Sequence, residues 1–133
     1  MGPPAWLTFL EDRFISLYAR IFGHAVIFDP DELYRGVHPN WVRNGEISSG
    51  AFDGDMMSVD LAKITTVERC WRRMKRTQAG LASITAGLAR SQKQEVKHYP
   101  IPLNHAHTLV IGKKTRAVQR RLAKNARWVI KPG

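Results

Sequence analysis

The spacing of apolar residues predicts an amphipathic helix at the start of the chain. Between residues 4 and 22 the apolar side chains recur at intervals of three and four, and Gly23 suits the end of the helix. An apolar face so rich in aromatic side chains is unfavourable in water. We therefore expect it to pack on its own domain, on a partner protein or on a second copy of the chain. The predicted organisation is an N-terminal helix, residues 1–24, followed by a domain over residues 25–133.

Two further segments predict basic helices. Residues 65–76, TTVERCWRRMKR, carry a capping threonine, Thr65 or Thr66, ahead of a run of cations. Residues 115–129, TRAVQRRLAKNARWV, predict a final helix with Leu122 on its inner side.

Short apolar runs between turn residues predict strands. These strands are predicted over residues 33–37 (LYRGV), 46–52 (EISSGAF), 56–62 (MMSVDLA) and 107–112 (HTLVIG). Residues 95–102 (EVKHYPIP) are predicted to be extended, because Pro100 and Pro102 exclude a helix. Residues 80–90 fit either a strand or a buried helix, because β-branched residues stand among alanines. The sum is a single α+β domain with a small, mostly antiparallel sheet and about three helices.

The stretch NHAHTLVIGKKT, residues 104–115, resembles a phosphate loop only superficially. That motif places a glycine five residues before the Gly-Lys pair, and this position is His107. We therefore expect a buried strand in which Leu109 and Ile111 share one face, and Thr108 and Val110 share the other. His105 should be more exposed than His107, and Asn104 should lie in a turn.

Charge is distributed unevenly along the 133 residues. Up to residue 62 the chain has four arginines and nine acids, a net charge of −5, whereas the remainder has seventeen cations and two acids, a net charge of +15. A field of this kind attracts polyanions.

No apolar stretch of about 18 residues predicts a membrane span. The single cysteine, Cys70, excludes an internal disulfide and favours a cytoplasmic location.

These charges predict a binding module for nucleic acid or another polyanion. The expected contacts are cations on the two basic helices: Arg72, Arg73, Arg76, Lys113, Lys114, Arg116, Arg120, Lys124 and Arg127. Within this set Arg120, Lys124 and Arg127 are spaced to share one helix face. Thr115 with its flanking cations fits either an anion site or a plain helix cap. No base-reading motif is present, so we expect phosphate contacts with little sequence preference.

Histidines offer a second chemistry. His105 and His107 alternate, so on a strand both side chains face one side. A zinc site needs three or four ligands, and the other histidines stand in separate segments. We therefore predict no metal site, and the pair has either a structural or a ligand-contacting role.

A third pattern suggests a small enzyme. Arg35 and His38 flank a glycine at a strand end, and Ser48 and Ser49 follow on the next predicted strand. This arrangement resembles the NAD-binding cleft of ADP-ribosyltransferases, which implies NAD as cofactor and a later catalytic glutamate. The chain has only Glu68 and Glu95 after residue 60, and neither lies in such a motif.

The alternative function is thus an enzyme with an Arg/His/Ser cleft. Its catalytic residues would be Arg35, His38, Ser48, Ser49, His105 and His107, which requires residues 33–49 and 104–108 to converge. The segments LYRGVHPNWV, ISSGAF, MSVDLA and NHAHTLVIG also resemble small uncharacterised bacterial proteins, which implies a compact cytosolic protein of bacterial or phage type.

Overall fold

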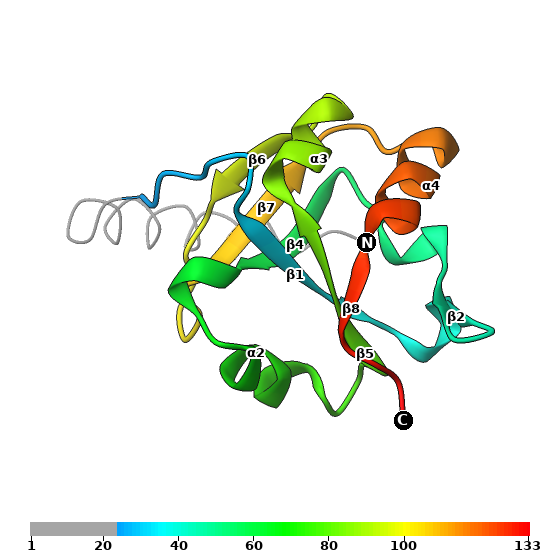
Figure 1. Cartoon of the computed structure of the whole chain (residues 1–133). Helices are drawn as coiled ribbons and strands as arrows, with labels where there is room; N and C mark the ends of the chain where they lie inside the picture. The colour runs from blue at the N-terminus through cyan, green and yellow to red at the C-terminus, as the bar shows by residue number, and fades with distance from the viewer. Residues whose placement is uncertain (1–23) are drawn as a thin grey trace, which may run out of the picture.

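The described residues form a main antiparallel sheet of six strands, and its arrangement can be followed in Figure 1. The computed structural model describes residues 24–133, so the helix predicted over residues 4–22 lies outside the described part. The strands follow the order β6-β7-β4-β1-β5-β8, and every neighbouring pair is antiparallel. Their bounds are β1 Glu32–Val37, β4 Met56–Leu61, β5 Gly80–Thr85, β6 Glu95–His98, β7 His107–Ile111 and β8 Arg127–Ile130.

Smaller elements join these strands. A two-stranded sheet, β2 Val42–Arg43 and β3 Glu46–Ile47, sits between the 3-10 turns η1 Pro39–Trp41 and η2 Ser49–Ala51. A third 3-10 turn, η3 Ala62–Ile64, leads from β4 toward the first described α-helix. The predicted α+β fold with a mostly antiparallel sheet is confirmed.

The described residues contain three α-helices, and each begins at a threonine. These helices are α2 Val67–Met74, α3 Ala86–Ser91 and α4 Arg116–Asn125. The hydroxyl oxygens of Thr66, Thr85 and Thr115 accept hydrogen bonds of 3.1–3.2 Å from backbone N–H groups three residues on. These caps satisfy N–H groups that have no partner inside the helix.

The helices cover opposite faces of the sheet, as the alternation along β1 shows. Leu33 and Val37 belong to the larger apolar core, which also contains Leu122 of α4 and alanines of α3. Tyr34, between them, points the other way into a smaller cluster with Cys70 of α2. Because successive strand residues face opposite sides, α2 lies on one face, and α3 and α4 lie on the other (Figure 1).

The ambiguous segment 80–90 is both a strand and a helix. Strand β5 ends at Thr85, which is also the cap of α3. Ile84 is buried in the larger core beside β1, which explains the β-branched residue, while Ala86 and Ala89 let α3 pack closely on the sheet.

Two predicted elements are shorter than expected. The final helix ends at Asn125, because Ala126 is extended and the next residues form strand β8. Trp128 of this strand pairs with Ala82 of β5, and its indole N–H donates to the carbonyl oxygen of Gly45 over 2.9 Å. The strand predicted over residues 46–52 covers only Glu46–Ile47, and η2 follows it.

The strand predicted within residues 104–115 is confirmed as β7. Thr108 and Val110 are opposite Val59 and Met57 of β4 and are buried on the face that α3 and α4 cover. Leu109 lies on the α2 face. His105 is exposed and His107 half-buried, as expected, and Asn104 lies in the preceding turn.

None of the helices in the described part of the chain has the length and apolar content required to cross a bilayer.

Candidate nucleic-acid interface

The arginine of the proposed enzyme cleft holds two backbone segments together. Arg35 Nε donates to the carbonyl oxygen of Ala51, and Arg35 Nη1 donates to that of Ser58, both over 3.0 Å. A longer contact of 3.4 Å joins Arg35 to Asp53. Burial lowers the pKa of Arg35, although an arginine remains charged in such a setting. The side chain therefore fixes η2 against β4.

His38, Ser48 and Ser49 shape the connection between β1 and β4. His38 Nδ1 accepts a hydrogen bond of 3.1 Å from the backbone N–H of Asn40 and so caps η1. The backbone N–H of Ser48 donates to Trp41 over 2.7 Å, and the carbonyl oxygen of Ser49 closes η2.

His107 faces the opposite side of the sheet from Arg35. Its Nε2 lies 3.1 Å from Ser58 Oγ, and its Nδ1 lies 2.7 Å from the carbonyl oxygen of Tyr99. In register His107 pairs with Asp60, whose side chain points toward α2, whereas Arg35 lies on the face of the larger core. The structure therefore does not bring Arg35, the serines and the histidine pair into one cleft.

A third histidine, not singled out by the sequence, is the most buried of the five described. His98 is 3% exposed. Its Nδ1 accepts from the backbone N–H of Ala25 over 2.9 Å, and its Nε2 donates to the carbonyl oxygen of His105 over 2.7 Å. Burial lowers the pKa of His98. Both ring nitrogens are thus used in holding the chain, and within residues 24–133 no three metal-binding side chains gather at one point.

Most acids of the described chain form ion pairs with cations that lie in strands, in helices and in the turn η3. Five ion pairs join them, and their cations are Arg35, Lys63, Arg73, Arg90 and Arg127. Among the described residues, Arg73 is the one cation of α2 and α4 that has a carboxylate partner. Six of the seven cations on the two helices therefore have no carboxylate partner in the described chain.

Helix α2 presents its arginines on one side. Arg69, Arg72 and Arg73 lie within about 100° of the helix circumference, and Arg76 follows in the turn after the helix. We call Arg69, Arg72 and Arg73 the arginine face. All three are exposed, while Cys70 packs on the sheet from the opposite side. Burial raises the pKa of the Cys70 thiol, which makes it unreactive.

Helix α4 carries a separate stripe. Arg116, Arg120 and Lys124 recur at every fourth position and are exposed. Two predicted contacts are otherwise engaged. Lys114 Nζ donates to the carbonyl oxygens of Val110 and Gly112 over 2.8 and 3.1 Å, and burial lowers its pKa. The predicted stripe is wrong at Arg127, which lies in β8 and pairs with Glu32.

The two basic helices do not form one surface. They pack on opposite faces of the sheet, so a ligand that lies along α2 does not lie along α4 at the same time (Figure 1). The part of the chain that the structure describes thus has two basic surfaces with different surroundings.

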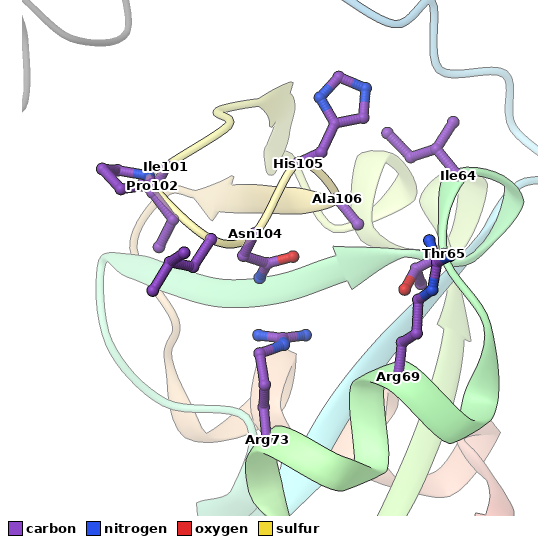
Figure 2. A pocket seen from close by; sticks show the side chains of 10 residues that line it. Ile64, Thr65, Arg69, Arg73, Ile101, Pro102, Asn104, His105 and Ala106 are labelled. Atoms are coloured by element: carbon purple, nitrogen blue, oxygen red, sulfur yellow. The ribbon is translucent and has the colours of Figure 1, made fainter.

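A cavity of about 340 Å³ borders the arginine face. It lies between α2 and the loop of residues 101–106, at the end of β4 (Figure 2). Arg69 and Arg73 extend from α2 toward this loop. The other lining residues are Ile64, Thr65, Ile101, Pro102, Leu103, Asn104, His105 and Ala106. Of the six residues predicted for an enzyme cleft, His105 alone lines this cavity.

A buried carboxylate fixes one side of the cavity. Asp60 is 2% exposed and pairs with Arg73. Its other oxygen accepts a hydrogen bond of 2.9 Å from Asn104 Nδ2. Asp60 therefore links β4 to both walls, while Arg69 has no carboxylate partner in the described chain. An acid at an inward position of the apolar run MMSVDLA is the signal in the sequence that could have pointed here.

Comparison with protein-family models, with curated proteins and with solved structures gives no match to this chain.

Proposed function

We propose that the protein binds nucleic acid through phosphate contacts made by Arg69 and Arg72 of the arginine face and by Arg76 in the turn after α2. One observation carries this proposal: Arg69, Arg72 and Arg73 share one exposed side of a short helix, and of the three only Arg73 has a carboxylate partner in the described chain. Guanidinium groups suit phosphate because their planar N–H groups bind two oxygens at once.

The stripe on α4 supports the proposal as a second, weaker surface. Arg116, Arg120 and Lys124 span about 12 Å along the helix axis. They add to the positive field that attracts a polyanion to the molecule. Phosphate contacts alone carry no base identity, so we expect little sequence preference. The lone, buried Cys70 supports a cytoplasmic location within the same proposal.

The salt dependence of binding tests this function. A labelled single strand of about twelve nucleotides and the matching duplex are titrated with protein between about 50 and 200 mM salt. Affinity should fall linearly on a log–log scale, with a slope near −0.7 per phosphate contact for the single strand and about −0.9 for the duplex.

Two variants with equal loss of charge locate the surface. Replacing Arg69, Arg72 and Arg76 with Gln should flatten the slope by about two units for the single strand, whereas replacing Arg116, Arg120 and Lys124 with Gln should flatten it less. Absence of binding at about 50 mM salt, or a larger loss in the α4 variant, would refute the proposal.

A further inference from the structure

The cavity beside α2 combines three chemistries within a small volume. Arg69 and Arg73 supply cations at one wall, and Thr65 and Asn104 supply polar groups (Figure 2). Apolar side chains form the rest: Ile64, Ile101, Pro102, Leu103 and Ala106. The volume of about 340 Å³ lies at the lower end of the range for small-molecule sites.

We propose that this cavity takes up one nucleotide, with the base between the loop and α2 and the phosphate on Arg69. The inference rests on the proposed function, because the arginine face holds the strand that presents the nucleotide. It adds that the preferred ligand is single-stranded nucleic acid or a free nucleotide, and not a duplex.

A nucleotide matches the lining better than a simple anion does. Its base has flat faces that pack on apolar groups or on a guanidinium plane, and its edge needs hydrogen-bonding partners. Its phosphate needs a cation, and Arg69 stands at the cavity without a carboxylate partner in the described chain. An inorganic anion would leave the contacts of Ile64 and Ile101 unused.

Arg73 is suited to contact the base and not the phosphate. Asp60 already balances its charge and holds its guanidinium group in place. Asn104 holds the same carboxylate from the loop side, so the two walls are linked before any ligand arrives. Such preorganisation lowers the entropy lost on binding.

Leu103 gives independent support. Its side chain is fully exposed at the rim of the cavity, and its backbone has a φ of 69°. The left-handed conformation is unfavourable for a residue other than glycine, and an apolar side chain in water gains nothing in return. Backbone strain of this kind is concentrated at ligand-binding loops.

Duplex DNA or RNA cannot use the cavity without disruption. Its bases are stacked and paired, and turning one out costs free energy before any contact forms. We therefore expect the single strand to bind about tenfold more tightly than the duplex at equal salt. This ratio corresponds to the affinity gained when one base stacks on a protein side chain.

The test fills the cavity without altering charge. In Thr65→Tyr a larger side chain occupies the cavity, and Thr77→Tyr makes the same change in the exposed turn after α2. Fluorescence anisotropy with the single strand and the duplex should show that Thr65→Tyr removes the tenfold preference and leaves duplex affinity unchanged. Thr77→Tyr should alter neither.

Arginine variants repeat the comparison without any bulky group, which covers the case in which Thr65→Tyr fails to fold. Arg69→Gln should weaken single-strand binding more than duplex binding, whereas Arg72→Gln, outside the cavity, should weaken both equally. Competition with a mononucleotide then separates the sources of the ligand. Displacement that Thr65→Tyr abolishes identifies a free nucleotide, and preference without displacement identifies a nucleotide within a strand.

The failures of the two proposals are distinguishable. Equal affinity for single strand and duplex, with equal effects of Arg69→Gln and Arg72→Gln, overturns the cavity inference and leaves phosphate binding standing. Absence of binding to either nucleic acid overturns both.

Discussion

Helices α2 and α4 have the same local design and different surroundings. Each begins at a capping threonine, exposes three cations on one side and packs on the sheet with the other. Helix α4 buries Leu122 in the larger core, and its cations form a straight stripe. Helix α2 packs on the small cluster of Tyr34, Cys70 and Leu81, and its arginines border a cavity. The two helices therefore carry similar charge. They differ in what lies next to that charge, because only the arginines of α2 border this cavity.

This difference suggests a division of roles. Helix α4 closes the larger core and adds to the positive field, whereas α2 contributes less to the core and carries the proposed binding site. Variants that affect stability should therefore be most harmful at α4, and variants that affect binding should be most harmful at α2 and its neighbouring loop.

The largest expected effect is on the core under α4. Leu122→Ala leaves a cavity in the larger core and should lower the free energy of unfolding by about 2–5 kcal/mol. Cys70→Ala, in the small cluster under α2, should cost about 1 kcal/mol. Urea denaturation measures both, and equal losses would contradict the proposed division of roles.

Asp60→Asn tests the link between the walls of the cavity. The variant keeps a hydrogen-bond acceptor for Asn104 and removes the charge that balances Arg73. We expect the free energy of unfolding to fall by about 1.5 kcal/mol, the low end for a hydrogen bond to a charged group, because Arg73 is partly exposed to solvent. The preference for single strands should fall with it. An unchanged preference measured by anisotropy would show that Arg73 needs no support from Asp60.

Acid should weaken the face of the sheet that α4 covers, through His98. Burial holds the pKa of His98 below its ordinary value, although the hydrogen bond to the carbonyl oxygen of His105 opposes this, and the charges of His24, His105 and His107 lower the pKa further. Because the unfolded chain binds the proton more readily, the contribution of His98 to stability is complete above about pH 6.5 and is lost as the pH falls through the folded pKa. A protonated Nδ1 also cannot accept from the Ala25 N–H.

The matched measurement is the melting temperature from about pH 7.5 to pH 5. His98→Gln should flatten this profile, whereas His38→Gln, which alters an exposed cap, should leave it unchanged. Identical profiles for wild type and His98→Gln would contradict the assignment.

The smallest expected effect is at Leu103. Leu103→Asn places a residue that tolerates the left-handed conformation at φ 69° and should stabilise the fold by about 0.5–1 kcal/mol. Binding of a single strand should nevertheless weaken, because the apolar rim is lost. A variant that is more stable and binds less well would mark the strain as functional, and a gain in both would place Leu103 outside the site.

The sequence was most informative where the structure is local. The structure confirms the cap at Thr115, the strand from His107 and the turn at Asn104, and it selects Thr66 over Thr65 as the cap of α2. Each of these features follows from neighbouring residues. Strand β8 was missed because its apolar residues continue the helical spacing of α4, and pairing with β5 overrides that preference.

The cavity depends on contacts that no local pattern contains. Asp60 joins α2 to the loop of residues 101–106. The link to the loop is the hydrogen bond with Asn104, which lies 44 residues after Asp60 in the chain. A prediction of Arg72, Arg73 and Arg76 as contacts required only a count of charges, whereas the importance of Arg69 depends on what faces it across the cavity.

A residue-by-residue map of binding tests the central claim most directly. Uniformly ¹⁵N-labelled protein is titrated with a short single strand, and amide chemical shifts are followed by NMR. We predict that the largest changes fall on α2 and residues 101–106, with smaller changes on α4. Changes centred on α4 or on the segment from Arg35 to Ser49, with α2 unaffected, would contradict the account.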